Sequence, residues 1–143
     1  MRQTIHTTTF LLLILLSSQS LFAQSTFTSQ VTSGNWNSSG SWTENTNGNP
    51  ADSDGIPDAD DDVIIASGHT ITLTVDAAAN DVSIQGGSLY LQNPSPSTTN
   101  RNFNIGGNLD ATNTSSLDAD DNLNRQQVLV AGNFSVTSGT YPR

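Results

Sequence analysis

The segment from Asp61 to Asp76, DDVIIASGHTITLTVD, most narrowly limits what this chain can fold into. Its large apolar residues occupy alternate positions on either side of Ser67-Gly68: Val63 and Ile65, then Ile71, Leu73 and Val75. Alternation with a period of two predicts β-strands, and β-branched residues favour them. We therefore predict two short strands around a tight corner, each with one buried apolar face and one wet polar face.

Couples of such apolar pairs recur along the chain, with a glycine corner inside each couple. The couples are Val63/Ile65 with Ile71/Leu73, Val82/Ile84 with Leu89/Leu91, Phe103/Ile105 with Leu109/Ala111, and Val128/Val130 with Phe134/Val136. The corners are Ser67-Gly68, Gly86-Gly87, Gly106-Gly107 and Ala131-Gly132. The first members lie 19, 21 and 25 residues apart (63 to 82, 82 to 103, 103 to 128). Such a period is typical of a solenoid, in which each coil buries its face by stacking on the next.

Antiparallel hairpins in a sandwich are the alternative, since strands joined by a few residues with a glycine also fit a hairpin. Two features favour the solenoid. The corners lack the Asn-Gly pair that tight hairpins prefer, and the couples resemble one another while the segments between them do not. We therefore predict an all-β chain of stacked coils, with loops at 93–102 and 112–127 that project from the stack.

Residues 1–23 are predicted to be a secretory signal peptide that is cleaved before Gln24. Arg2 supplies a positive charge, Phe10 to Leu16 form an unbroken apolar run, and small Ala23 precedes the expected cut. The run is too short to cross a bilayer, which needs about 20 residues. A short buried strand or helix is the alternative. We expect export to the cell exterior and no membrane insertion after cleavage.

The composition of the remaining 120 residues narrows the classes of partner. They carry three arginines, no lysine and thirteen acidic residues, a formal charge of −10. Nucleic acid and anionic membranes are therefore poor partners, because phosphate binding depends on basic side chains. The chain has no cysteine, which excludes a disulfide framework and a thiolate zinc site. Divalent cations are the partners that this charge favours.

Two tryptophans lie in a segment, 24–50, that is otherwise rich in Ser, Thr, Asn and Gly. This composition disfavours helix, and we expect a strand or two followed by a loop. One interpretation is that Trp36 and Trp42 cover the open end of a β core, because aromatic side chains usually contribute through buried area. The other is a glycan-binding site in which both indoles stack on sugars, and this requires two exposed rings on one face.

An acidic loop follows, with six aspartates in the eleven residues from Asp52 to Asp62. The candidate calcium ligands around Gly55 are Asp52, Asp54, Asp58 and Asp60, because calcium prefers carboxylate oxygens. The sequence DSDGIPD also resembles the calcium loops of thrombospondin type-3 repeats. A helix-loop-helix calcium site is excluded, since placing Gly55 at its sixth position puts Pro50 at the first. A solvated acidic loop is the alternative.

The order of motifs carries a further resemblance. The motifs are Gly34-Asn35-Trp36, Trp42, Pro57, Asp61 to Ile65, Gly68 to Leu73, and Val82 to Leu89. They resemble the opening coils of right-handed β-helix domains in large secreted surface proteins of Bacteroidetes, and are similar to the eight-glycine extracellular domain. The resemblance covers nearly all of residues 31–136. It implies a right-handed parallel β-helix and type IX export. Such proteins usually end in a sorting domain, which is absent here, so we expect an incomplete solenoid.

These observations predict three parts: a signal peptide at 1–23, an N-terminal cap region at 24–62 and solenoid coils at 63–143. We expect a secreted or cell-surface structural or adhesive module, without a catalytic residue, whose partners are glycans or other surface components. His69 is expected to form hydrogen bonds at a corner. One alternative is the leading part of a polysaccharide-degrading β-helix lyase or hydrolase whose active coils lie beyond residue 143. Another is a calcium- or glycan-binding module.

Overall fold

The structure is a computed structural model that describes residues 24–48, 50–92, 101–119 and 126–137. These residues form thirteen strands, β1 to β13, and one turn of 3-10 helix, η1 (Ser39–Ser41). The predicted signal peptide lies outside the described residues. Within the described part of the chain, no helix is long and apolar enough to cross a membrane.

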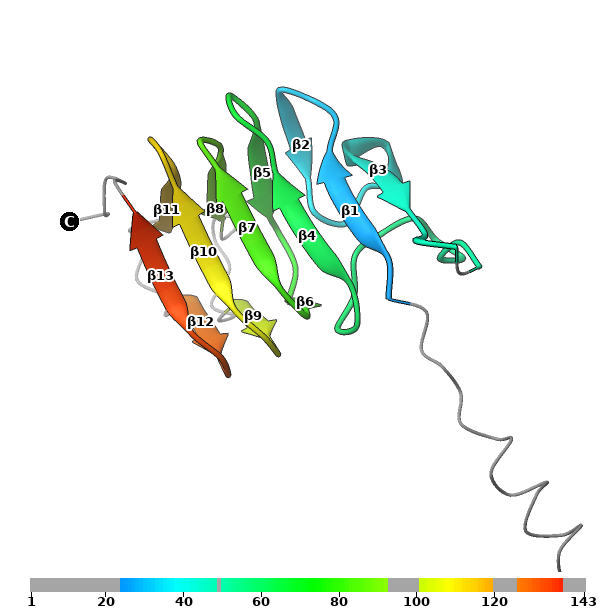
Figure 1. Cartoon of the computed structure of the whole chain (residues 1–143). Coiled ribbons are helices and arrows are strands. Elements are labelled where there is room, and N and C mark those ends of the chain that lie inside the picture. The colour runs from blue at the N-terminus through cyan, green and yellow to red at the C-terminus, as the bar shows by residue number, and fades with distance from the viewer. Residues whose placement is uncertain (1–23, 49, 93–100, 120–125, 138–143) are drawn as a thin grey trace, which may run out of the picture.

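The strands form three sheets (Figure 1). Sheet A has the order β13-β10-β7-β4-β1-β3 and contains β1 (Thr26–Ser29), β3 (Trp42–Asn45), β4 (Asp62–Ile65), β7 (Val82–Gln85), β10 (Leu109–Thr112) and β13 (Phe134–Thr137). Sheet B has the order β11-β8-β5-β2 and contains β2 (Ser33–Asn35), β5 (Thr70–Leu73), β8 (Ser88–Leu91) and β11 (Ser116–Ala119). Sheet C has the order β12-β9-β6 and contains β6 (Ala77–Ala79), β9 (Arg101–Ile105) and β12 (Gln126–Val130).

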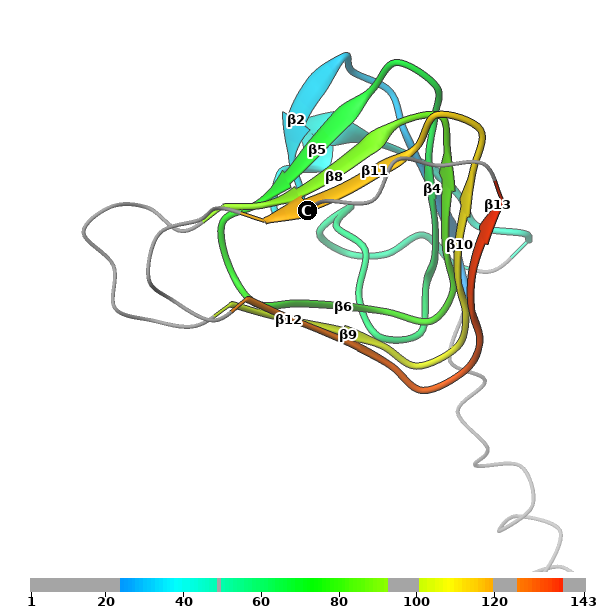
Figure 2. The ribbon, with the colours of Figure 1, turned by 90° about the vertical axis from the view of Figure 1, so that its left-hand side faces the viewer.

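From β4 onward the chain visits sheets A, B and C in turn, and each strand pairs in parallel with the third strand after it. We call three successive strands, one from each sheet, a circuit. Viewed along the stack, the sheets form the three sides of a triangular prism (Figure 2). The described chain is therefore all-β with parallel sheets, an arrangement compatible with a β-helix.

The alternation in the sequence positions the core. In β4 and β5 every second residue is buried, and Val63, Ile65, Ile71 and Leu73 are each 0–1% exposed. Both strands of the opening segment are thus confirmed. Val75 departs from the prediction: β5 ends at Leu73 and Val75 is 39% exposed, because the chain turns there toward sheet C.

The phase of the predicted repeat is partly wrong. Val63 does pair with Val82, as its spacing predicts. However, Val82 pairs next with Leu109 and not with Phe103, and Phe103 pairs with Ala77. The couples are therefore not equivalent, since the first two join sheets A and B and the last two join sheets C and A.

Two strands that complete the circuits were not predicted. β6 consists of three alanines, which give no contrast between large apolar and polar positions, and only Ala79 is fully buried. β11 lies within 112–127, a segment that was predicted to be a loop. Its only large apolar residue is Leu117, so its sequence shows no alternation. With β6 and β11 included, each circuit has three strands and the repeat becomes regular in space.

The glycine corners have two separate physical causes. Gly68 and Gly86 adopt φ angles of 76° and 79°, a left-handed conformation that side chains disfavour. Gly87 is needed for space, because a Cβ atom there would lie 2.5 Å from the carbonyl oxygen of Ala66 in the neighbouring circuit. The corners therefore fix how closely successive circuits stack.

Candidate metal site

The acidic loop joins β3 to β4 and folds back on itself through its own carboxylates. Asp54 Oδ1 accepts a hydrogen bond from the backbone N–H of Ile56 at 2.9 Å. Asp58 Oδ1 accepts one from the backbone N–H of Asp60 at 3.1 Å. Gly55 takes a φ of 66° between them. These turns are the conformations that aspartate and glycine favour in loops.

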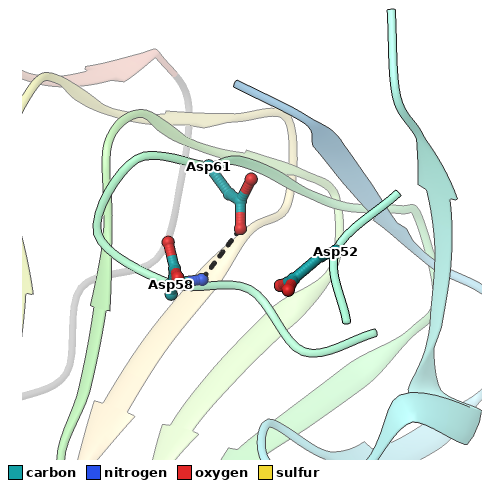
Figure 3. A group of neighbouring side chains, drawn as sticks. All are labelled: Asp52, Asp58 and Asp61. Atoms are coloured by element: carbon teal, nitrogen blue, oxygen red, sulfur yellow. Dashed lines mark hydrogen bonds between the residues drawn. The ribbon is translucent and has the colours of Figure 1, made fainter. Parts of the chain in front are cut away.

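Folding of the loop brings together three carboxylates: Asp52, Asp58 and Asp61. One oxygen of each lies within 4.8 Å of the others (Figure 3). A cavity of about 220 Å³ adjoins them, lined by Pro50, Ala51, Asp52, Ser53, Asp58, Asp60 and Asp61. The cluster runs from buried Asp61 through half-buried Asp52 to exposed Asp58, so a cation can reach it from solvent.

Asp61 is the anchor of the cluster. Its side chain is buried, and its Oδ1 accepts a hydrogen bond from the backbone N–H of Ser25 at 3.1 Å. Its Oδ2 accepts one from the backbone N–H of Asp58 at 3.0 Å, the bond drawn in Figure 3. An ionised carboxylate offers about four lone-pair positions, so these two bonds fix Asp61 and leave capacity for a cation.

Glu44 of β3 fixes the other side of the loop. Its Oε1 accepts hydrogen bonds from the backbone N–H of Asp52 and from the hydroxyl of Ser25, both at 2.8 Å. Ser25 thereby joins Glu44 to Asp61. The positions of Asp52 and Asp61 are therefore held by strand-linked groups and not by the loop alone.

The electrostatics of the loop favour a cation. Burial, reinforced by Asp54, raises the pKa of Asp52, and burial raises the pKa of Asp61. The hydrogen-bonded side chain of Asp58, followed by burial, raises the pKa of Asp60. No lysine or arginine occurs in the sequence between residues 24 and 100. The protein therefore supplies little positive charge to this loop, and a divalent ion would stabilise the ionised carboxylates.

The cluster contains two of the four predicted ligands and one residue that was not predicted. Asp52 and Asp58 lie in the cluster, Asp54 does not belong to it, and Asp60 lines the cavity without being one of the three. Asp61, which directly precedes β4, was not among the predicted ligands. The three-carboxylate cluster could hold a metal ion.

The tryptophans lie in the core and not on the surface. Trp36 and Trp42 are 2% and 4% exposed, and their rings meet edge to face with centroids 5.2 Å apart. Each indole N–H donates to a backbone carbonyl, Trp36 to Pro57 and Trp42 to Trp36. The two exposed rings that a sugar platform requires are therefore not present.

His69 forms the corner hydrogen bonds that its position predicts. Its Nδ1 lies 2.9 Å from the Ser29 hydroxyl and 3.1 Å from the Ser29 carbonyl oxygen. The hydroxyl of Ser29 also accepts a hydrogen bond from the backbone N–H of Ala66. The group ties the end of β1 to the corner after β4.

No known protein family, curated protein or solved structure matches the chain. The resemblance to β-helix domains therefore stays a prediction that rests on the motifs in the sequence.

Proposed function

We propose that this chain is a right-handed parallel β-solenoid that acts outside the cell as a structural or adhesive module, with calcium bound at Asp52, Asp58 and Asp61. The single observation that carries the proposal is the pairing of each strand with the third strand after it. That pairing generates three flat outer faces from a short repeat, as an extended scaffold requires.

The outer faces support a role in surface contact. The outward residues of sheet B form ladders across the circuits, of which one row is Ser33, Thr70, Ser88 and Ser116. A second row on the same face is Asn35, Thr72, Tyr90 and Asp118. Hydroxyl, amide and carboxylate groups at regular spacing suit hydrogen bonding to glycan hydroxyls.

The acidic cluster supports a role for calcium. Calcium takes six to eight oxygen ligands and tolerates irregular geometry, so three carboxylates with water and carbonyl oxygens suit it. Extracellular modules bind calcium in the range of about 10⁻⁴ to 10⁻³ M, which is the affinity expected for a partly exposed loop.

The test is thermal unfolding of the purified chain in chelator and in millimolar calcium, followed by circular dichroism. A ligand that binds only the folded state raises its stability by mass action, so calcium should raise Tm. The double substitution Asp52→Asn with Asp58→Asn should abolish the shift. Asp110→Asn, an exposed aspartate on the outer face of sheet A, is the matched control and should retain it. A shift that survives the double substitution would refute the site.

The scaffold role has a separate test. Intact-mass measurement of the exported protein should give an N-terminus at Gln24. Beads coated with that protein should be retained on glycan-bearing surfaces more strongly than beads coated with heat-unfolded protein. Equal retention of both would count against an adhesive surface.

A further inference from the structure

The first two residues after the predicted cleavage point are held by three carboxylates. The side-chain amide of Gln24 donates to Asp62 Oδ1 at 3.0 Å. The backbone N–H of Ser25 donates to Asp61 Oδ1 at 3.1 Å, and the Ser25 hydroxyl donates to Glu44 Oε1 at 2.8 Å. Each bond reaches a different acidic residue. The start of the predicted mature chain is therefore bound to the acidic loop and to the strands on either side of it.

Strand pairing fixes where this segment lies. It leads directly into β1, which is an inner strand of sheet A between β3 and β4 (Figure 1). Thr26 is in register with Asn45 of β3 and with Asp62 of β4. The backbone N–H of Asp62 also donates to the Ser25 carbonyl oxygen at 2.9 Å, and Ser25 is 1% exposed. The backbone is thus held on both sides as far as Ser25, and Gln24 is the next residue.

Cleavage before Gln24 would change the chemistry of this position. In the uncleaved chain the backbone nitrogen of Gln24 belongs to an uncharged peptide bond. After cleavage it is a primary amine, which is largely protonated at neutral pH. Consecutive backbone nitrogens are less than about 4 Å apart, so this nitrogen lies within about 7 Å of Asp61 Oδ1. Cleavage therefore places a positive charge beside the carboxylates.

The acidic loop has few other sources of positive charge. Residues 44–62 contain seven acidic residues, and residues 24–100 contain no lysine or arginine. With His69 neutral, the new amino group is the only positive charge before Arg101 in the sequence. Burial raises the pKa of Asp61, so its ionised form gains from any positive charge nearby. The amino group created by cleavage supplies such a charge.

We propose that the α-ammonium of Gln24, formed when residues 1–23 are removed, pairs with Asp61 and Asp62 as an internal counter-ion of the candidate metal site. Cleavage then stabilises the acidic loop before any metal binds. The ammonium also weakens the binding of a second cation, because like charges repel. The inference rests on the export and cleavage in the proposed function, but not on the binding of calcium.

Acetylation tests the proposal, because the chain has no lysine and the α-amino group is the only primary amine of the mature protein. The exported protein is acetylated at neutral pH, and intact mass identifies its first residue and the single added acetyl group. In chelator, acetylation should lower Tm by about one to four degrees, as expected for the loss of a largely exposed ion pair. An unchanged Tm would overturn the proposal.

An insertion separates the position of the ammonium from its charge. Gly-Ser inserted between Ala23 and Gln24 keeps a free amino group but moves it two residues away from the carboxylates. In chelator, this variant should unfold at about the Tm of the acetylated wild type, and acetylation should change its Tm little. A variant that is as stable as the wild type and loses as much Tm on acetylation would contradict the proposed position.

A pair of substitutions identifies the carboxylate partner. Asp62→Asn should reduce the loss of Tm on acetylation by about half or more, since one of the two partners is then uncharged. Asp110→Asn, on the exposed outer face of sheet A, is the matched control and should leave the loss unchanged. Circular dichroism shows whether both variants are folded. Equal losses in the two variants would overturn the contact with Asp62.

The mass and the calcium response keep this inference apart from the proposed function. A chain that starts at another residue would overturn it. So would a mass lower by one molecule of ammonia, which marks attack of the Gln24 amino group on its own side-chain amide. If calcium changes neither Tm, the metal site fails, while a loss on acetylation in chelator still supports the ammonium. If calcium binds, it should reduce that loss, because the ion supplies the positive charge instead.

Discussion

The N-terminal and C-terminal ends of this molecule are made from the same kind of strand but differ in how they end. At the closed end Trp36 is 2% exposed and its ring lies 4.8 Å from that of Phe103, a residue of sheet C. At the other end Phe134 faces the core and is half exposed. The comparison teaches that a repeated strand unit determines the walls of such a stack but not its ends, which need residues outside the repeat.

The closed end depends on an unusual pairing of large and small residues. Trp36 reaches Phe103 although Phe103 is in register with Ala77, a residue of the intervening strand β6. The small alanines of β6 leave room for the indole. The tryptophan thus occupies space that a larger side chain in β6 would fill, and the cap and the first full circuit are packed as one unit.

Replacement of that indole is expected to have the largest effect. Trp36→Ala should reduce the free energy of unfolding by about 3–5 kcal/mol, because it removes a buried aromatic side chain and leaves a cavity. Urea unfolding followed by circular dichroism measures the loss. A loss below about 1 kcal/mol would mean that the closed end does not stabilise the stack, and would break the comparison between the two ends.

Substitution at a corner between the two ends should lower the free energy of unfolding by a smaller amount. Ser115 is 2% exposed, and its hydroxyl donates to the Ile84 carbonyl oxygen at 2.6 Å and accepts from the Gly86 N–H at 2.9 Å. Ser115→Ala should cost about 1–3 kcal/mol, the range for leaving buried polar groups without a partner. Ser116→Ala, at the next position on the outer face of β11, is the control and should change stability little. Similar costs for both would contradict a specific role of the buried hydroxyl.

Substitution at the open end should lower the free energy of unfolding least among these three sites. Phe134→Ala is expected to cost about 1 kcal/mol or less, because the ring is already half exposed. Phe103→Ala provides the same substitution at a fully buried position and should cost about 3–5 kcal/mol. Equal losses in urea unfolding would show that the end of sheet A is covered in the monomer.

The smallest expected effect concerns pH. The pKa values of Asp52, Asp60 and Asp61 are raised above 3.8, so the folded state binds protons at a higher pH than the unfolded state. In chelator, their contribution to stability should therefore fall as pH rises from 3.8 through the raised pKa values, and increase on acidification through that window.

The measurement is the difference in Tm between the wild type and an Asp52→Asn/Asp60→Asn variant, followed against pH. We expect the wild type to gain about one or two degrees relative to the variant on acidification. At neutral pH, millimolar calcium should raise the Tm of the wild type above that of the variant, because the ion binds the carboxylates that the variant lacks. A wild type that instead loses stability relative to the variant on acidification would mean that the folded chain lowers the pKa of these carboxylates and stabilises their ionised form.

Sequence predicted the walls of the fold well, because strands such as β4 and β5 alternate large apolar and polar residues. It did not predict β6, where alanines bury backbone and little side chain, so the pattern carries no signal. The phase of the repeat was wrong for the same reason. One strand that the pattern does not predict changes which couples of apolar pairs stack on one another.

The candidate site was predicted to a similar extent. Composition alone identified the acidic loop, and Asp52 and Asp58 followed from the ligand chemistry of calcium. The prediction named Asp54 and Asp60, which lie outside the cluster, and omitted Asp61, whose place depends on the backbone N–H of Ser25, 36 positions away in the chain. Long-range hydrogen bonds of this kind have no local sequence pattern.

The pairing of each strand with the third strand after it also bears on synthesis of the chain. A strand gains a partner edge once a neighbouring circuit has formed, and during synthesis the N-terminal circuits are complete first. Loop closures are then short and repeated, and the length of the molecule adds steps without lengthening any one of them. A chain that emerges N-terminus first thus produces each template before the strand that needs it.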